Sequence, residues 1–416
     1  MKPKLLTTIQ DYSWKIFASD ALAGITVAMV ALPLSIAIAI ASGAEPAAGL
    51  VTAIIGGLLI SALGGSRVQI GGPTGAFIVV VYGVIEQFGF DGLLLATLMA
   101  GVILIGAALA RAGKLIALIP EAVIEGFTIG IALIIAVSQL KDLFGLSIAK
   151  LPADFVATVP ALWNARHSVN TLAAAIGIAS IIAIALLRRR AGSIIVLSLA
   201  SASVALFMFP VETIHSRFGD LPNGLPYPSL PTMNIARISQ LLPSAFVIAF
   251  LAGVESLLSA IVADRMVGGA HRSNAELFAQ GAANIASPLF GGLPATGAIA
   301  RTAANVRAGG RTPVAGLVHA AAILIFVVAA APLAGYLAMP ALAALLVVTA
   351  WSMSEPHRWR EHFRARPADR FLLLLTMTLT VVSNLTVAIG VGTAVGLAQR
   401  LIRRDVEPAE WTPPDV

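Results

Sequence analysis

The chain has 416 residues, of which 58% are hydrophobic and only 12% are charged, and its mean hydropathy is +0.91. This composition excludes a soluble globular domain, in which about a quarter of the residues are charged. The chain contains no Cys, which excludes disulfides and thiol chemistry. The formal net charge of +6 would suit nucleic acid, but membrane proteins hold Lys and Arg in their cytoplasmic loops, so we expect no nucleic-acid partner.

Apolar runs of about 20 residues, the length of a membrane-crossing helix, recur along the whole chain. They are too long and too uniformly apolar for barrel strands, the other structure that satisfies its backbone in lipid. The sequence therefore predicts an all-α polytopic membrane protein with about 14 transmembrane segments, placed in the cytoplasmic (inner) membrane. We expect these segments near residues 21–41, 46–63, 73–85, 92–110, 118–140, 170–187, 192–209, 241–263, 274–290, 294–306, 313–331, 339–353, 370–384 and 386–401.

Two similar glycine-rich breaks interrupt the apolar pattern, Gly-Gly-Pro-Thr-Gly-Ala at 71–76 and Gly-Gly-Leu-Pro-Ala-Thr-Gly-Ala at 291–298. Each is expected to be a short extended segment that leads into a helix too short to cross the bilayer. Because Pro suits the first position of a helix, we expect these helices to begin at Pro73 and Pro294. Paired interrupted segments indicate a transport site, so the two helix starts should face each other near mid-membrane, where their free N–H groups attract an anion.

The two halves of the chain share a layout. Pro33 and Pro73 are 40 positions apart, and Glu255 and Pro294 are 39 positions apart. With seven spans in each half, an odd number, the second half must be inserted upside down relative to the first. The sequence therefore predicts a 7+7 inverted repeat, with the short helices at spans 3 and 10.

The placement of Lys and Arg indicates the orientation. Of the 27 Lys and Arg residues, Arg301 alone lies inside a span. With a cytoplasmic N-terminus, only five are external, and these are Lys141, Lys150, Arg166, Arg217 and Arg237. This bias favours cytoplasmic N- and C-termini.

Glu255 lies deep in the apolar eighth span, in Leu-Ala-Gly-Val-Glu-Ser-Leu-Leu. A carboxylate there costs at least about 2.5 kcal/mol on insertion scales, so it is a functional candidate by default. Ser259 is one turn further on the same face and could join a proton or sodium site. The alternative is a structural carboxyl group that is hydrogen-bonded to a helix end.

Arg301 lies in the short tenth helix and has two interpretations. It holds the substrate anion electrostatically, or it snorkels to the cytoplasmic surface and stabilises the negative end of its helix. His319 is alone on an apolar face, which favours packing over proton relay. The chain has no HExxH, no Cys/His cluster and no phosphate-binding loop, so we expect no enzyme activity, no metal and no cofactor.

Several stretches resemble the SulP anion transporters, the sulfate-permease family. The resemblance starts in Ala-Leu-Pro-Leu-Ser-Ile-Ala-Ile-Ala at 31–39 and continues in Gly-Ser-Arg-Val-Gln-Ile-Gly-Gly-Pro at 65–73. It is strongest in Glu-Ser-Leu-Leu-Ser-Ala at 255–260 and from residue 273 through the second break to residue 303. Together the similar stretches cover most of residues 20–355 in the family's order.

The resemblance implies a core domain of spans 1–4 (21–112) and 8–11 (241–335), and a gate domain of spans 5–7 (113–210) and 12–14 (336–401). Residues 1–20 would be a cytoplasmic segment, 211–240 an external linker and 402–416 a cytoplasmic tail. Family proteins are commonly homodimers and transport by an elevator-like motion of core against gate. Glu255 matches the position that bacterial members use for ion coupling. By position, the anion site would be lined by Leu34, Ile38, Thr74, Gly75, Ala76, Gly297, Ala298, Ile299, Ala300 and Arg301.

Two departures from the family pattern bear on function. Many relatives have Gln in place of Leu34 and an aromatic residue in place of Ile38 or Thr74, so the pocket is less polar on one wall. The substrate is therefore left open among an inorganic oxyanion, bicarbonate and a dicarboxylate. Family members usually continue into a cytoplasmic STAS domain, whereas this sequence stops at Val416. We therefore expect a bacterial member that lacks this domain.

We predict a secondary active transporter of a small anion, driven by proton symport through Glu255, with sodium as the alternative coupling ion. A nucleobase–proton symporter of the same fold is the nearest alternative. Such proteins typically have a second carboxylate on the tenth span, and none lies between Pro294 and Arg307. An anion channel or a voltage-responsive membrane motor would be distinguished by single-channel currents, and a receptor or scaffold by the absence of flux.

Overall fold

The computed structural model describes residues 2–10, 12–113, 120–187, 192–383 and 385–402. Within these ranges the chain is helical apart from its loops and two strands of two residues each, which confirms the all-α prediction. Among the residues that the structure describes, six stretches are long and apolar enough to cross a bilayer, namely Trp14–Ala41, Pro46–Leu63, Gly75–Leu109, Glu121–Leu143, Ile235–Val267 and Val314–Gly335. Two further apolar helices of the described chain, α9 (Thr171–Leu186) and α10 (Gly192–Leu206), are shorter.

The first half of the chain contains α1 (Leu5–Thr8), α2 (Trp14–Ala41), α3 (Pro46–Val51), the π-helical turn η1 (Thr52–Gly56), α4 (Gly57–Leu63), β1 (Gly71–Gly72), η2 (Gly75–Phe77), α5 (Ile78–Leu109), α6 (Glu121–Ser138), α7 (Leu140–Leu143), α8 (Phe155–Asn164), η4 (Ala165–Ser168), α9 (Thr171–Leu186) and α10 (Gly192–Leu206). The second half contains α11 (Ile214–Phe218), α12 (Ile235–Val267), α13 (Ser273–Leu289), β2 (Thr296–Gly297), α14 (Ile299–Ala308), α15 (Val314–Gly335), α16 (Met339–Met353), η5 (Pro356–Arg358), α17 (Trp359–Arg364), α18 (Pro367–Val382) and α19 (Leu385–Ile402).

Most expected spans correspond to helices within a few residues. The second span, 46–63, is one helical stretch with a π-helical turn at its centre. The third and fourth spans are joined at Gly89, whose φ of +73° breaks the helical geometry within α5. Glycine reaches this conformation without the Cβ penalty of other residues, so the two helical parts meet at a kink with almost no loop.

Two boundaries differ from prediction. The first helix, α2, begins at Trp14 within the segment assigned to the cytoplasm, and α12 begins at Ile235 within the linker. The connection after the fifth span contains α8, which is too short to give an apolar-run signal. The start of the fifth span at 118–119 and the tail at 403–416 lie outside the described residues.

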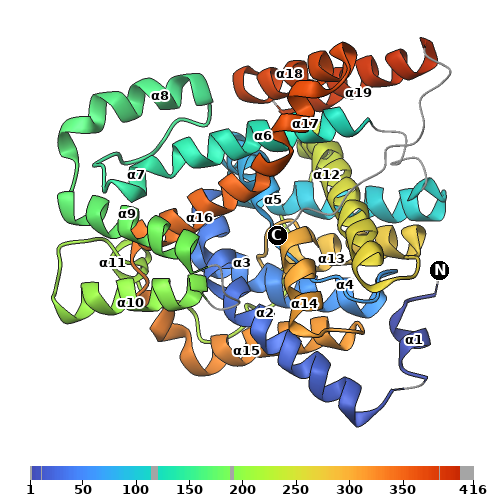
Figure 1. The fold of residues 1–416 in the computed structure, drawn as a ribbon, viewed down its shortest axis with the longest axis horizontal. Helices are drawn as coiled ribbons and strands as arrows, with labels where there is room; N and C mark the ends of the chain where they lie inside the picture. Colours follow the sequence, from blue (N-terminus) through green and yellow to red (C-terminus); the bar gives the residue numbers. More distant parts are fainter. Residues whose placement is uncertain (1, 11, 114–119, 188–191, 384, 403–416) are drawn as a thin grey trace.

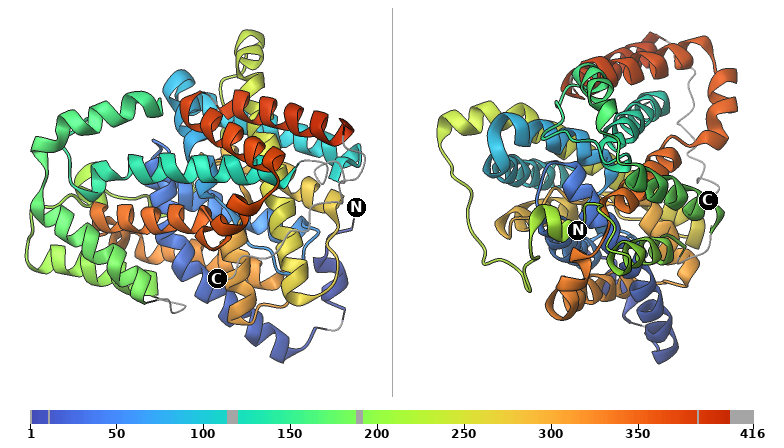
Figure 2. Two further views of the ribbon diagram at one scale, coloured as in Figure 1. Left: turned by 45° about the horizontal axis from the view of Figure 1, so that its top comes forward. Right: turned by 90° about the vertical axis from the view of Figure 1, so that its left-hand side faces the viewer.

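The helices pack into two bundles (Figures 1 and 2). In the core bundle, α5 packs on α12 and α13, and α2 packs on α15. In the gate bundle, α6 packs on α18, and α16 packs on α6 and α9. The long loop between α7 and α9, which includes α8, lies at the far edge of the gate bundle. The two bundles meet where η2 contacts α6 and α16, so the first glycine-rich break ends at the boundary between them.

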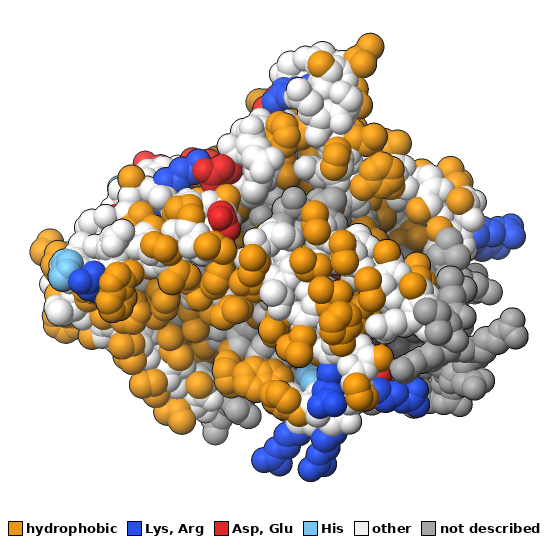
Figure 3. Space-filling view, turned by 90° about the horizontal axis from the view of Figure 1, so that it is seen from above, with side chains coloured by type: hydrophobic (Ala, Val, Ile, Leu, Met, Phe, Trp, Pro, Cys, Tyr) orange, Lys and Arg blue, Asp and Glu red, His pale blue; other side chains and the backbone are white. Residues whose placement is uncertain are grey.

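Hydrophobic side chains cover much of the molecular surface, as expected for a protein solvated by lipid. Figure 3 shows them spread across one face, with Lys and Arg gathered at its margins. Many are large and exposed, for example Leu206 at 79%, Leu186 at 78% and Val102 at 56%. An exposed apolar surface of this kind is stable only against a bilayer.

Candidate functional site

The two glycine-rich breaks pair with each other. β1 and β2 form a two-stranded antiparallel sheet in which Gly71 lies opposite Gly297 and Gly72 opposite Thr296. The Ala298 N–H extends the ladder by donating to the Ile70 carbonyl oxygen at 2.9 Å. The antiparallel register is what an inverted repeat requires, because an axis in the membrane plane relates strands that run in opposite directions. The two breaks therefore lie side by side, as predicted, and their position near mid-membrane stays a prediction.

The helices that follow the strands begin later than predicted. Helical geometry starts at Gly75 in η2 and at Ile299 in α14, not at Pro73 and Pro294. The prediction was wrong because the backbone next to each proline is extended and not helical. In the first break the strand lies before Pro73, and in the second break it lies after Pro294. Neither helix start has a side-chain cap, although the backbone carbonyl of Thr74 accepts from the Phe77 N–H and that of Ala298 accepts from the Thr302 N–H. The first-turn N–H groups that these bonds do not use remain available to a ligand.

Arg301 points inward and crosses between the two repeats. Its side chain is 4% exposed, which excludes the snorkelling interpretation. Its Nη2 donates to the Pro73 carbonyl oxygen at 2.9 Å and to Ser35 Oγ at 3.3 Å. The Nε and Nη1 atoms are buried and have no partner among the described residues. A buried guanidinium group with unused donors is suited to hold an additional acceptor, such as a water or an anion.

Gly72 makes room for Arg301. Its φ is +148°, and a Cβ built on it would lie 2.4 Å from Arg301 Nη1. Any larger residue would be strained at that φ and would displace the guanidinium group. Gly72 therefore has a specific role, because it lets the Arg301 side chain from the opposite repeat approach the backbone closely.

Glu255 is joined to the first helix start. Its Oε2 atom accepts a hydrogen bond of 2.8 Å from Thr74 Oγ1, the residue that precedes η2. Arg301 donates to the carbonyl oxygen of Pro73, the residue before Thr74, so the carboxyl group and the guanidinium group meet at the same helix start. The structure thus brings together the carboxylate, the arginine and both helix starts, which the sequence assigned separately.

Ser259 lies elsewhere in this region. It is fully buried and its Oγ is 3.1 Å from Thr302 Oγ1, which in turn accepts from the Ile70 N–H at 3.1 Å. No described contact joins Ser259 to Glu255. The i,i+4 spacing predicted both side chains on one face of α12. In the structure the Ser259 hydroxyl group contacts Thr302, which binds the backbone at Ile70 just before β1, and not the Glu255 carboxylate.

A buried network behind the strands was missed by the sequence analysis. Glu276 accepts from the Gly65 and Ser66 N–H groups at 2.9 and 3.2 Å and from Ser256 Oγ at 2.9 Å. Gln69 Nε2 donates to the same Ser256 hydroxyl at 2.7 Å. The signal was present, since Glu276 is a carboxylate within an apolar span like Glu255. Ser35 could have been found similarly, as the only polar side chain from Val27 to Ala41.

Most of the remaining assigned residues are buried or half-buried, whereas Ala300 is exposed. On α2, Leu34 directly precedes Ser35 and is half-buried. Ile38 lies about one turn after Ser35 and is buried. Gly75 faces the gate bundle, where a Cβ would lie 3.0 Å from Met353 Sδ on α16. His319 is fully buried, and neither ring nitrogen has a partner among the described residues. The structure thus gives His319 no hydrogen-bonded proton path.

This arrangement defines a class of protein, a polytopic membrane transporter with a 7+7 inverted repeat and core and gate domains. The chain belongs to the sulfate permease family, because the Sulfate permease family model matches residues 17–376. It is therefore an anion transporter of that family and not an enzyme.

Similar curated proteins include the "Putative sulfate transporter YvdB" of Bacillus subtilis, which is 42% identical over 388 residues, 92% of this chain and 73% of that protein. The "Bicarbonate transporter BicA" of a Picosynechococcus species is 30% identical over 390 residues, 90% of this chain and 69% of that protein. The names of these relatives describe two different substrates.

Solved structures confirm the fold. The transmembrane domain of a cyanobacterial bicarbonate transporter, BicA, superposes with a TM-score of 0.83 at 29% identity, covering 91% of this chain and 98% of that one. SLC26A9 superposes with a TM-score of 0.87 at 18% identity, covering 97% of this chain and 68% of that one. At 18% identity the likeness concerns the fold alone.

Proposed function

We propose that this chain is a secondary active transporter of a small inorganic oxyanion, with sulfate as the leading candidate and bicarbonate as the second. The observation that carries the proposal is the pair of uncapped helix starts held side by side by β1 and β2. The 42% identity with a putative sulfate transporter favours sulfate, and the 30% identity with BicA supports bicarbonate.

The anion is bound at the helix starts, near Thr74–Ala76 and Gly297–Arg301. Each helix N-terminus contributes partial positive charge, and Arg301 adds a full charge close by. Backbone N–H groups and helix dipoles share the binding with Arg301, so several moderate contacts select the anion and still permit its release. Leu34 and Ile38 supply an apolar wall on the α2 side.

Glu255 couples the anion to a proton. An ionised Glu255 repels an anion that approaches the adjacent Thr74, and protonation removes that repulsion. Anion and proton then favour each other's binding, which is the coupling that symport needs. Ser259 acts as a support of the strand, and sodium remains an outcome of the test below.

Transport proceeds by movement of the core, residues 21–112 and 241–335, against the gate, residues 113–210 and 336–401. The site faces the gate through Gly75, so a slide of the core carries the anion across the boundary. We place the chain in the cytoplasmic membrane with both termini in the cytoplasm, and we propose a homodimer in which the gates are the fixed part.

The proposal is tested by uptake into proteoliposomes. Labelled sulfate, bicarbonate and succinate are offered with and without an inward proton gradient, to the parent chain and to Glu255→Gln. We expect saturable sulfate uptake that the gradient stimulates several-fold, and loss of this stimulation in Glu255→Gln with residual exchange preserved. A sodium gradient replaces the proton gradient in a parallel series.

The outcomes separate the parts of the proposal. Uptake that is indifferent to both gradients and to Glu255→Gln would contradict the coupling role of Glu255 and retain the carrier. Uptake of a nucleobase but of no anion, by protein shown to be folded, would contradict the anion assignment. Single-channel currents would contradict a carrier mechanism.

A further inference from the structure

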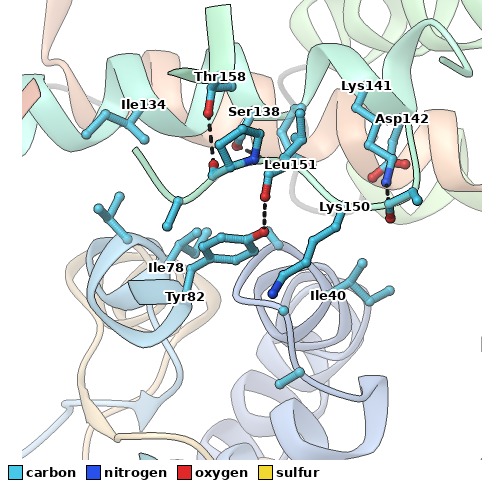
Figure 4. A pocket seen from close by; sticks show the side chains of 18 of the residues that line it. Ile40, Ile78, Tyr82, Ile134, Ser138, Lys141, Asp142, Lys150, Leu151 and Thr158 are labelled. Atoms are coloured by element: carbon cyan, nitrogen blue, oxygen red, sulfur yellow. Dashed lines mark hydrogen bonds between the residues drawn. The ribbon is translucent and has the colours of Figure 1, made fainter. Parts of the chain in front are cut away.

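Two cavities of the described chain differ in how their charges are balanced. The larger, of about 440 Å³, lies between core and gate, and Figure 4 shows Tyr82 of α5 on one side of it and Asp142 of α7 on the other. There Lys150 pairs with Glu86 at 3.3 Å, and Arg217 pairs with Asp142 at 2.6 Å. Once these partners are counted, the larger cavity has no excess of positive charge and indicates no anionic ligand.

The second cavity, which we name the basic cavity, has a volume of about 410 Å³ and has only cations among its charged lining residues. It lies between the N-terminal segment, the end of α5 and the start of α13, which contribute Lys2, Arg111 and Arg272 respectively. None of these three side chains forms an ion pair with another described residue. Unpaired cations that line one cavity repel each other, and an anion bound between them offsets that repulsion.

Backbone contacts hold the walls of the basic cavity in place. Nη1 of Arg272 donates to the carbonyl oxygens of Lys2 and Pro3, at 2.8 and 3.3 Å. The Gly113 N–H donates to Asn274 Oδ1 at 3.1 Å, and a Cβ on Gly113 would lie 2.8 Å from the same oxygen. The turn after α5 thus fits closely against the start of α13, and the N-terminal segment is tied to Arg272. These contacts form the basic cavity without the help of a ligand.

The charges next to the basic cavity increase its positive potential. Burial lowers the pKa of the Lys4 ammonium group, and the cations Arg272 and Arg67 lower it further. Asp264 acts in the opposite direction, and Glu276 lies in the first turn of α13. Among the described residues, the three lining cations with Lys4 and Arg67 thus face two nearby carboxylates. The excess of positive charge remains after the neighbours are counted.

An exposed apolar face of α5 ends at the basic cavity. Leu109 lines the cavity and is 65% exposed, and Val102 is 56% exposed. Between them, a Cβ on Gly106 would meet no atom within 4 Å. Residues 102, 106 and 109 are four and three positions apart, so they share one face of the helix. An acyl chain can therefore lie along α5 while a polar group joined to it occupies the basic cavity.

From these observations we infer that the basic cavity binds the phosphate group of an anionic phospholipid, whose acyl chains lie along the exposed face of α5. The excess of positive charge suits the phosphate, and the adjoining apolar face favours a lipid over a free phosphate. Basic pockets between membrane helices hold lipid headgroups in this way. The site is separate from Arg301 and the two helix starts, and the inference does not depend on which anion is transported.

The test measures lipid binding to the purified chain by native mass spectrometry. Protein freed of lipid in detergent is titrated with phosphatidylglycerol or with the zwitterionic phosphatidylcholine. The parent chain should bind one phosphatidylglycerol at least about ten-fold more tightly than phosphatidylcholine, because each basic residue near an anionic headgroup contributes about a five-fold gain. Equal affinities for the two lipids would overturn the inference.

The test variant combines Lys2→Gln with Arg111→Gln. Neither side chain forms a hydrogen bond or an ion pair with another described residue, so their loss should leave the fold intact. The affinity for phosphatidylglycerol should fall by about 10- to 30-fold. Each single substitution should give a smaller loss, which keeps the test informative if the combined variant does not fold.

The matched control combines Arg265→Gln with Arg307→Gln. Both are exposed arginines that do not line the basic cavity, so the control removes the same number of charges elsewhere. Its affinity for phosphatidylglycerol should stay within about two-fold of the parent value. Equal weakening in the control and the test variant would show that only the overall charge matters, and would overturn the inference. Gel filtration and thermal unfolding in phosphatidylcholine show whether each variant is folded.

A competition experiment distinguishes a lipid from a soluble phosphate. Glycerol 3-phosphate carries the same phosphate group without acyl chains, and it is added to the complex of the parent chain with phosphatidylglycerol. We expect the lipid to remain bound when the two ligands are present at equal concentration. Displacement under that condition would assign the basic cavity to soluble phosphates and overturn the assignment to a lipid.

Discussion

At the scale of single residues, the centre depends on how Arg301 reaches across the repeats. Its position needs the absence of a side chain at Gly72 and two acceptors, the Pro73 carbonyl and Ser35. The sequence could predict that Arg301 lies in a short helix near the site. It could not predict the direction of a long flexible side chain, which is decided by acceptors more than 200 positions away.

The residue-scale prediction concerns the charge of Arg301. Arg301→Gln should lower the initial rate of anion uptake by about 10- to 100-fold, since a hydrogen bond to a charged group contributes about 1.5–3 kcal/mol. Arg307→Gln is the control, because Arg307 lies on the same helix, α14, and is exposed. Comparable losses in the two variants, measured in proteoliposomes with matched protein content, would show that Arg301 has no particular role.

At the scale of elements, small residues determine how closely the core helices approach. Gly101 on α5 and Gly281 on α13 face each other, and a Cβ on either would lie less than 3 Å from the other's carbonyl oxygen. In lipid, helices associate through such close packing rather than through the hydrophobic effect. The high glycine and alanine content predicted close packing, but not which glycines meet, because that depends on which helices become neighbours.

The element-scale prediction is Gly281→Ala. It should lower the free energy of unfolding by about 1–3 kcal/mol, the usual cost of inserting a methyl group into a filled contact. Gly106→Ala on α5 is the matched control, because no atom lies within 4 Å of the added Cβ. It should be neutral or slightly stabilising, since Ala has the better helix propensity. Thermal unfolding in detergent with matched lipid content measures both, and an equal effect would contradict the packing argument.

For the strand pair, the sequence predicted the pairing of the two breaks but not the starts of the helices that follow them. The similarity of the two breaks predicted that they face each other, and β1 and β2 do so. The starts of the helices at Pro73 and Pro294 were wrong, because local preference for Pro at a helix start was overridden by pairing of backbones 224–226 positions apart. α8 was missed because a ten-residue helix in a loop leaves no apolar run.

At the scale of the whole molecule, function requires the core to move relative to the gate. The seven-plus-seven order, the core and gate bundles and the family were all predictable, because the apolar runs and the quoted stretches are long and numerous. The contacts that restrain the motion, such as Glu86 with Lys150 and Tyr82 with Leu151, were not, since they join loops whose course the sequence pattern does not specify.

The whole-molecule prediction is that linking core to gate stops transport. Glu86→Cys with Lys150→Cys, joined by a short bifunctional thiol reagent with a reducible spacer, should lose most uptake and regain it on reduction. The control pair is Ser147→Cys with Ser168→Cys, which lies within the gate and whose parent residues are joined by a hydrogen bond of 2.9 Å. Uptake that survives complete linkage of the first pair would contradict motion of core against gate.

The central claim is that the transported anion is held between the starts of η2 and α14. The most direct measurement is the anomalous difference map of crystals soaked in selenate, a tetrahedral analogue of sulfate, recorded at the selenium edge. The account predicts a peak within hydrogen-bonding distance of the first-turn N–H groups of both helices, absent in Arg301→Gln. A peak confined to other parts of the protein, with both helix starts empty in protein that takes up sulfate, would contradict it.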